Sequence, residues 1–298
     1  MNQTDQIIGC IIGGAIGDAF GGAFENQLPP IDFSADHEWR LSDDTQLTLA
    51  TCEAMIASGD VIESAKIAAR FAVWHSQKRI TGLGASTLKA VTELMHGGHW
   101  ALVGRKGDRA AGNGAAMRIA PLAFCLDPKE AAARQIIRDV SRITHHHEEA
   151  YAGALAVVVA VRSALTGDWQ GEQNLLELVI AALPDTSVRD RLIEFSKLDL
   201  PISYLAQKFG CSGYVVESVP LAIYAAQQIL RLGFAQMMQE TISVGGDTDT
   251  NASIAGQIAG ALIGYQRLPV TMIEKLPERE MSQTIAHVLA TLLAFSQP

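Results

Sequence analysis

The sequence is poor in cysteine and in positive charge. It has only four cysteines, each alone in an apolar or helical stretch with no CxxC pair. It therefore carries no paired-thiol motif, and we expect buried thiols in a reducing compartment. Its 23 lysines and arginines are outnumbered by 32 acidic residues, which gives a net charge of -9. This balance argues against a nucleic-acid partner, although a few basic side chains or backbone amides suffice to bind a phosphorylated ligand.

The sequence also lacks a hydrophobic run long enough to cross a membrane. Its most apolar run, residues 150–161, is closed by Glu149 and Arg162 and falls short of the roughly 20 residues that a bilayer requires. This run predicts a core helix. The first five residues lack the basic region that opens a signal peptide. We therefore expect a soluble, cytoplasmic protein with no membrane partner.

Patterns typical of strands are missing as well. No run alternates apolar and polar residues between hairpin turns, and there is no repeat or low-complexity linker. Apolar residues instead recur at spacings of three and four, and glycine or proline separates the segments. We predict one all-α domain over residues 1–298, a compact orthogonal helical bundle with a central dinuclear metal cleft. The expected helices cover residues 5–23, 45–58, 61–77, 84–96, 115–126, 128–143, 148–165, 172–182, 187–197, 214–231, 234–243, 250–264 and 281–296.

Two short acidic clusters stand out, each in a loop that leads into an expected helix. They are Ser42-Asp43-Asp44-Thr45 and Gly245-Gly246-Asp247-Thr248-Asp249-Thr250. Hard divalent cations such as Mg²⁺ prefer oxygen ligands of this kind, whereas four carboxylates without a cation would repel one another. We therefore predict that the clusters are two halves of one metal site. The alternative is N-capping, in which these side chains accept hydrogen bonds from the first amides of a helix.

Small residues indicate how the two clusters could meet. Glycine and alanine are concentrated in residues 9–22 and 252–264, and small residues on helix faces permit close backbone approach. We expect the first and last thirds of the chain to pack tightly together. This packing would bring the two acidic clusters to the centre of the bundle.

Three further segments offer groups to the same site. Glu25 ends an apolar segment, where an unpaired carboxylate would be costly to bury, and is a candidate fifth acid; Asp18 is expected to support packing or hydrogen bonding. Residues 105–118 form a glycine-rich loop that enters an expected helix. Its amides could hold phosphate, or it could be an ordinary flexible turn. Of the three consecutive histidines 145–147, we expect His145 to line the pocket and the other two to be solvated.

Six motifs in this order resemble those of the ADP-ribosylglycohydrolase family, which includes the dinitrogenase reductase-activating glycohydrolases and the ADP-ribosylarginine hydrolases. The resemblance spans residues 8 to about 265 and implies an all-α fold, two Mg²⁺ (or Mn²⁺) ions and removal of ADP-ribose from a modified side chain. The motifs are Gly17-Asp18 with Glu25, Ser42-Asp43-Asp44-Thr45, Gly112-Asn113-Gly114-Ala115-Ala116-Met117-Arg118, Thr144-His145, Ser212-Gly213-Tyr214-Val215-Val216 and Gly246-Asp247-Thr248-Asp249-Thr250.

The resemblance also implies residue roles. The implied metal ligands are Glu25, Ser42, Asp43, Asp44, Asp247, Asp249 and Thr250. The implied substrate-binding residues are Gly112, Asn113, Gly114, Ala115 and Met117 of the glycine-rich loop, with His145 and Tyr214 bordering the cleft. The sequence departs from the family at two places: Ser42 stands where many members have threonine, and residues 82–84 (Gly-Leu-Gly) stand where many have Asp-Ile-Gly.

The chemistry of the implied reaction agrees with this set. Cleaving a ribosyl C1 bond passes through an oxocarbenium-like centre and needs an activated water and fixed ribose hydroxyls, which two metals roughly 3.5–4 Å apart can provide. Asp43, Asp44 or Glu25 could accept the proton of the water. We expect a Mg²⁺-dependent hydrolase of ADP-ribosylarginine on modified proteins. A serine linkage, a small-molecule ADP-ribose conjugate and a catalytically silent ADP-ribose binder are the alternatives.

Overall fold

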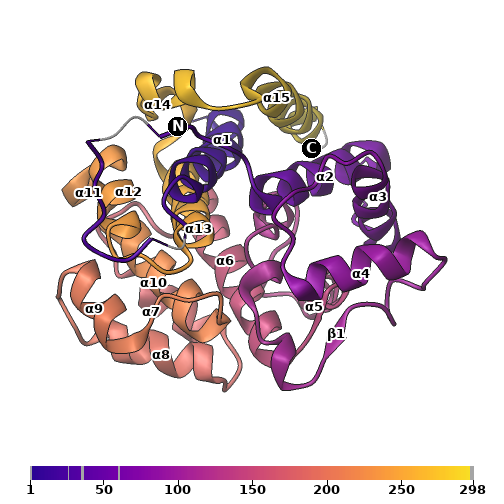
Figure 1. Ribbon diagram of the computed structural model, residues 1–298, viewed down its shortest axis with the longest axis horizontal. Helices are drawn as coiled ribbons and strands as arrows, with labels where there is room; N and C mark the ends of the chain where they lie inside the picture. The colour runs from indigo at the N-terminus through magenta and orange to yellow at the C-terminus, as the bar shows by residue number, and fades with distance from the viewer. Residues whose placement is uncertain (1, 26, 35–36, 60, 296–298) are drawn as a thin grey trace.

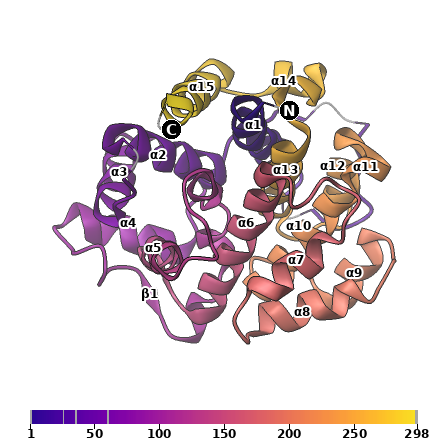
Figure 2. The same ribbon diagram turned by 180° about the vertical axis from the view of Figure 1, so that it is seen from behind.

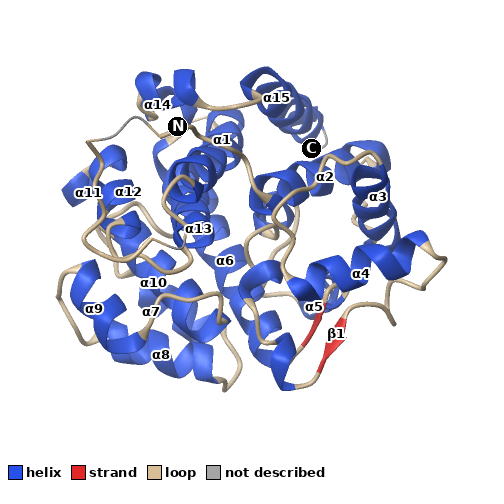
Figure 3. Cartoon of the chain, in the orientation of Figure 1, coloured by secondary structure: helices blue, strands red, loops and turns tan. Residues whose placement is uncertain are grey.

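The computed structural model describes residues 2–25, 27–34, 37–59 and 61–295. The regular secondary structure of this part of the chain is almost entirely helical (Figure 3), which confirms the predicted all-α fold. The α-helices are α1 (Gln3–Gly22), α2 (Asp43–Ser58), α3 (Ser64–Ser76), α4 (Ala85–Met95), α5 (Ala131–Arg142), α6 (Glu148–Thr166), α7 (Leu175–Ala182), α8 (Ser187–Ser196), α9 (Ile202–Phe209), α10 (Val215–Gln227), α11 (Ile229–Leu232), α12 (Phe234–Ile242), α13 (Thr248–Ile263), α14 (Val270–Lys275) and α15 (Arg279–Phe295). The short elements are strands β1 (Arg105–Lys106) and β2 (His145–His146) and the 3₁₀ turns η1 (Asp108–Ala110), η2 (Asn113–Ala115), η3 (Ala120–Phe124) and η4 (Tyr265–Arg267).

Helices α1 and α13 lie side by side at the centre of the molecule (Figure 1). They run in opposite directions, and their glycine-rich faces bring the two backbones into contact. A Cβ atom at Gly13 would lie 2.5 Å from the Gly256 carbonyl oxygen, and one at Gly17 would overlap the Ala252 carbonyl. The predicted close packing of the first and last thirds of the chain is therefore confirmed.

Helix α6 passes through the middle of the bundle and contacts α1, α5, α7, α8, α10 and α13. By length and composition it is apolar enough to cross a membrane, but 78% of its 18-residue apolar stretch is buried inside the structure. Its apolar run is the core helix that the sequence predicts. Helices α2–α5 lie on one side of this centre and α7–α12 on the other, while α15 packs on α1 and α2 (Figures 1 and 2).

Several elements differ from the sequence-based expectation. The expected helix at 115–126 is replaced by turns η2 and η3, and Pro121 within η3 has no amide to donate. Helices α9 and α14 were not expected, because 8 and 6 residues are too few to show a clear helical period. Strands β1 and β2 also were not expected; they pair in parallel, with Arg105 opposite His145.

The four cysteines are free thiols, but they are not all buried. Cys10 and Cys52 are buried in the core, as expected, and burial raises the pKa of both thiols. Cys125 and Cys211 are only partly buried, so the expectation of four core thiols is correct for two of them.

Candidate active site

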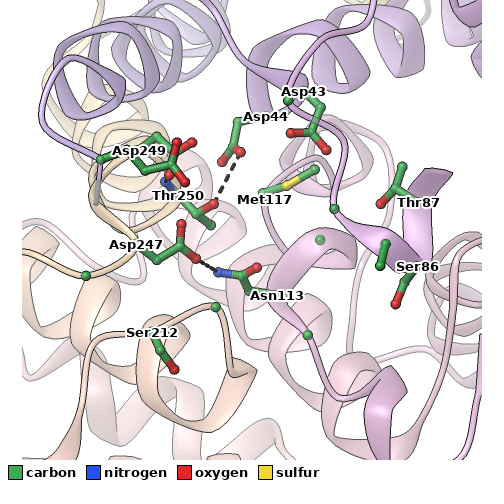
Figure 4. Close-up of a pocket in the computed structure, with 18 of the residues that line it drawn as sticks. Asp43, Asp44, Ser86, Thr87, Asn113, Met117, Ser212, Asp247, Asp249 and Thr250 are labelled. Atoms are coloured by element: carbon green, nitrogen blue, oxygen red, sulfur yellow. Dashed lines mark hydrogen bonds between the residues drawn. The ribbon is translucent and has the colours of Figure 1, made fainter. Parts of the chain in front are cut away.

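Most of the predicted site residues meet at one cavity of about 640 Å³. Its wall combines the segment after α1, the start of α2, the glycine-rich loop and the start of α13 (Figure 4). The predicted residues that line it are Glu25, Asp43, Asp44, Gly112, Asn113, Gly114, Met117, His145, Asp247, Asp249 and Thr250. The structure thus brings them together, while their individual roles stay predictions.

The two acidic clusters touch each other across this cavity. Thr250 Oγ1 donates a hydrogen bond to Asp44 Oδ2 at 3.2 Å, although the two residues are 206 positions apart in sequence. Asp43 and Asp44 face Asp247 and Asp249 in Figure 4. The contact exists because α1 holds α13 close, so that the first turn of α13 lies opposite the first turn of α2.

Burial and mutual repulsion make this cluster electrostatically costly. The pKa values of Asp43 and Asp44 are raised well above the usual range, first by burial and then by the charge of Asp249. Burial, followed by contact with the Asp247 carboxyl, raises the pKa of Asp249 to about 8. Asp44 Oδ1 is buried and has no hydrogen-bond partner in the described part of the chain. A nearby positive charge would stabilise the ionised form of such buried carboxylates.

The carboxylates gather without forming a closed coordination sphere. Among the described residues, no group of three or more His, Cys, Asp or Glu side chains is arranged to hold a metal ion as it stands. The metal, and the number of ions, therefore stay predictions.

Ser42 and Asp18 support the acidic cluster from behind. Ser42 Oγ accepts from the Asp44 amide at 3.2 Å and donates to Asp18 Oδ1 at 2.7 Å. Asp18 also accepts from the Thr45 amide at 3.1 Å, and burial raises its pKa to about 6. The hydrogen-bonding role expected of Asp18 is therefore confirmed. Ser42 does not line the cavity but sits directly behind Asp44.

The N-capping alternative holds for one cluster and not for the other. Ser42 caps α2 through its bond with the Asp44 amide. Asp247 occupies the N-cap position of α13, yet its side chain makes no capping hydrogen bond. Asp247 Oδ2 instead accepts from Asn113 Nδ2 at 2.6 Å, which ties the acidic cluster to the glycine-rich loop.

Three predicted residues are placed differently from what we expected. Glu25 lines the cavity but is exposed, so the argument from burial was wrong for it. Ala115 is fully buried behind the loop and does not reach the cavity wall. Tyr214 pairs with Gly112 through the backbone, while its side chain is 42% exposed and lies outside the cavity lining.

The glycine-rich loop enters 3₁₀ turns and not an α-helix, so the expected helix N-terminus is absent there. His145 lines the cavity, as expected. His146 and His147, expected to be solvated, bind the backbone instead: His146 Nε2 is 2.6 Å from the Val103 carbonyl oxygen, and His147 Nδ1 accepts from the Glu149 amide at 3.1 Å.

Sequence reasoning missed Arg105, the only lysine or arginine among the described residues that line the cavity. Its half-buried side chain reaches the cavity because β1 pairs with β2. A basic residue at the start of the glycine-rich loop was the available signal. Other lining residues that were not singled out as binding groups are Gln27, Leu28, Gly82, Gly84, Ala85, Ser86, Thr87, Ser212, Gly213 and Gly246.

Comparison with known proteins assigns the chain to a family. A model of the family described as ADP-ribosylglycohydrolase matches residues 1–297. The chain belongs to this family. It is therefore an enzyme, a glycosidase that removes ADP-ribose by hydrolysing the ribosyl bond.

Relatives within the family cover most of the chain. The ADP-ribosyl-[dinitrogen reductase] glycohydrolase of Rhodospirillum rubrum is 26% identical over 84% of this chain and 79% of its own. The ADP-ribosylarginine hydrolase Tri1 of Serratia proteamaculans is 25% identical over 85% of this chain and 67% of its own. A solved structure described as an ADP-ribosylglycohydrolase-related protein complex has a TM-score of 0.74 and 25% identity, and the match covers 97% of this chain and 98% of that one.

Proposed function

We propose that this family member releases ADP-ribose from modified arginine side chains by hydrolysing the N-glycosidic bond, with two Mg²⁺ (or Mn²⁺) ions as cofactors. The observation that carries the proposal is the meeting of two acidic helix starts at one cavity. One family relative is named for ADP-ribosylarginine, which supports the choice of linkage. The proposed substrates are ADP-ribosylated proteins in the cytoplasm.

The residues present fit hard divalent cations. Such cations prefer carboxylate and hydroxyl oxygens, and the cluster offers both while leaving Asp44 Oδ1 buried without a partner. When bound, the cations supply Lewis-acid activation of water and fix the ribose hydroxyls. The proposed ligands are Asp43, Asp44, Asp247, Asp249 and Thr250, with Ser42 behind them and Glu25 at the exposed edge.

The chain's own residues bind and orient the two halves of the substrate. The loop from Gly112 to Met117 offers backbone groups to the diphosphate or the distal ribose, and Arg105 adds a positive charge beside it. One carboxylate among Asp43, Asp44 and Glu25 accepts a proton from the attacking water. The oxygen of that water bonds to ribose C1 as the bond between C1 and the guanidine nitrogen breaks, and the nitrogen of the released arginine takes up a proton.

The proposal is tested by product release. Purified protein is incubated with Mg²⁺ and with arginine-linked or serine-linked ADP-ribosylated protein, and free ADP-ribose is measured by mass spectrometry. We expect release from the arginine-linked substrate, and loss of that release when the metal is removed by a chelator. Release from serine alone would overturn the arginine assignment, and no release from either linkage or from a small ADP-ribose conjugate would overturn the function.

A further inference from the structure

Arg118 is a buried cation beneath the glycine-rich loop. It is fully buried, and it donates to the Gly114 carbonyl, to the Val140 carbonyl at 3.3 Å and to Thr144 Oγ1 at 2.9 Å. Burial lowers the pKa of Arg118 to about 10, with Asp43 opposing this shift, so the side chain stays charged at neutral pH. A charge among neutral acceptors costs folding free energy, and apolar residues could fill the same space without that cost.

The Thr144 hydroxyl lies between Arg118 and His145, and its bond with Arg118 determines which group donates in its bond with His145. A guanidinium can only donate, so Thr144 Oγ1 is the acceptor in its bond with Arg118. Thr144 Oγ1 also lies 2.7 Å from His145 Nδ1, and this nitrogen can accept the single hydroxyl hydrogen. If Nδ1 carried a proton instead, the hydroxyl would face two donors, and its own hydrogen would have no recorded acceptor among the described residues.

The His145 ring carries only one proton at neutral pH. Burial lowers the pKa of His145 to about 3, and the nearby charges of Arg118, Arg105 and His146 contribute in the same direction. A neutral imidazole has one N–H and one acceptor nitrogen. Because Nδ1 is the acceptor, the proton lies on Nε2.

The Nε2 edge of the ring lies against two glycines of the cavity wall. A Cβ atom at Gly112 would lie 3.2 Å from His145 Nε2, and a Cβ at Gly114 would lie 2.8 Å from His145 Cε1. Both glycines and His145 line the cavity. The absence of side chains at these positions therefore leaves room for the Nε2–H group to reach a bound molecule.

We propose that Arg118 and Thr144 are positioning residues that hold His145 as the neutral Nε2–H tautomer, whose N–H donates a hydrogen bond to an oxygen of bound ADP-ribose. The identity of this acceptor rests on the proposed function, whereas the tautomer depends on the protein alone. A donor fixed in this way needs no proton uptake when a phosphate or ribose oxygen arrives. Its polarity also cannot reverse, because the other ring nitrogen, Nδ1, is already bonded to Thr144 Oγ1.

The tautomer can be measured directly by nuclear magnetic resonance on protein labelled with ¹⁵N-histidine. The His145 signals are assigned by their loss in a His145→Gln variant. We expect a protonated Nε2 and an unprotonated Nδ1 at neutral pH. A wild-type protein with its proton on Nδ1, or with a rapidly exchanging mixture, would overturn the proposal without any variant being needed.

Two substitutions at Thr144 separate positioning from packing. Thr144→Ser keeps the hydroxyl, whereas Thr144→Val keeps the shape and removes it. We expect the serine variant to retain the Nε2–H tautomer and wild-type affinity. The valine variant should show a mixture of tautomers and about tenfold weaker ADP-ribose binding by calorimetry, the loss typical of one hydrogen bond to a charged group. A folded valine variant with an unchanged tautomer would contradict the relay through Thr144.

The ligand titration keeps this proposal distinct from the proposed function. If the wild-type protein shows the Nε2–H tautomer and neither binds nor releases ADP-ribose, the proposed function fails and the positioning by Arg118 and Thr144 stands. If the wild-type protein binds ADP-ribose and releases it from a modified substrate, the proposed function stands. If the valine variant then binds ADP-ribose as tightly as wild type, the role of the relay in binding is overturned.

Discussion

Asp249 is the residue through which the two acidic clusters affect each other. After burial, its charge is the largest cause of the raised pKa values of both Asp43 and Asp44. Its own Oδ1 accepts from the Thr250 amide at 2.8 Å, a bond that an asparagine could retain. The charge of Asp249 can therefore be removed with little change in shape.

We predict that Asp249→Asn changes stability in opposite directions with and without metal. In the metal-free protein it removes a buried carboxyl whose ionised form is disfavoured, first by burial and then by Asp247, so we expect the free energy of unfolding near neutral pH to rise by about 1 kcal/mol. With saturating Mg²⁺ it should be less stable than wild type, bind Mg²⁺ more weakly and lose most of its turnover. Thermal melting with and without Mg²⁺, together with calorimetry, measures both effects.

The exposed carboxylate Asp199 provides the control. Asp199→Asn lies outside the cavity lining and should leave both melting curves unchanged. If Asp249 acted only on the helix start, its replacement by asparagine would be nearly neutral, because asparagine caps helices about as well as aspartate. Full activity at limiting Mg²⁺ in a folded Asp249→Asn protein would rule out its role as a metal ligand.

Arg105 gives a second prediction, on binding of the diphosphate. It is the one arginine or lysine among the described cavity-lining residues, so Arg105→Gln should weaken ADP-ribose binding about tenfold through loss of a charge-assisted hydrogen bond. Binding of adenosine, which has no phosphate, should not change. Lys106→Gln is the matched control, because Lys106 is the next residue of β1 and is exposed outside the cavity. Equal losses in both variants, or an equal loss for adenosine, would argue against a phosphate contact.

At the scale of secondary structure, the site depends on the contact between α1 and α13. The glycines of α1 let the two backbones touch, and this contact sets the distance between the first turn of α13 and the first turn of α2. An added methyl group in this contact would therefore change both the stability and the geometry of the acidic cluster.

We predict that Gly17→Ala lowers the free energy of unfolding by about 2 kcal/mol, as overpacked cores do, and weakens Mg²⁺ binding. The new Cβ would overlap the Ala252 carbonyl, which the helix backbone cannot easily move. Gly22→Ala in the same helix is the control, since its Cβ would meet Arg40 O at 3.6 Å and Asp249 Cβ at 3.9 Å, both ordinary contacts. Urea unfolding and calorimetry would show whether Gly17 differs from Gly22; if the two variants matched, α1 and α13 would not set the site geometry.

Element types were predictable where the sequence pattern is local. The starts of α2 and α13 carry serine, aspartate and threonine before a periodic segment, so the acidic clusters could be placed at helix starts in advance. The path of residues 105–118 could not, because 3₁₀ turns and a two-residue strand leave no periodic signal. For the same reason the position of Arg105 beside His145 follows only from the pairing of β1 with β2.

At the scale of the whole molecule, the fold joins two ends of the chain at one site. Asp44 belongs to the first fifth of the sequence and Thr250 to the last, and their side chains are hydrogen bonded at 3.2 Å. The order of the motifs along the sequence was enough to predict that the two acidic clusters belong to one site. That they close on the same cavity depends on α1 packing against α13, a tertiary contact that small residues permit and do not dictate.

We predict that Mg²⁺ links these two ends of the chain. A ligand that binds only the folded state at about 100 times its Kd stabilises the protein by about 2.7 kcal/mol, so Mg²⁺ should raise the melting temperature and a chelator should lower it. Hydrogen–deuterium exchange should slow together at the starts of α2 and α13, because ligands from both helices hold the same ions. KCl at matched ionic strength controls for general screening of the carboxylates. Protection confined to one of the two helix starts would show that they do not share a metal site, even if the protein as a whole were stabilised.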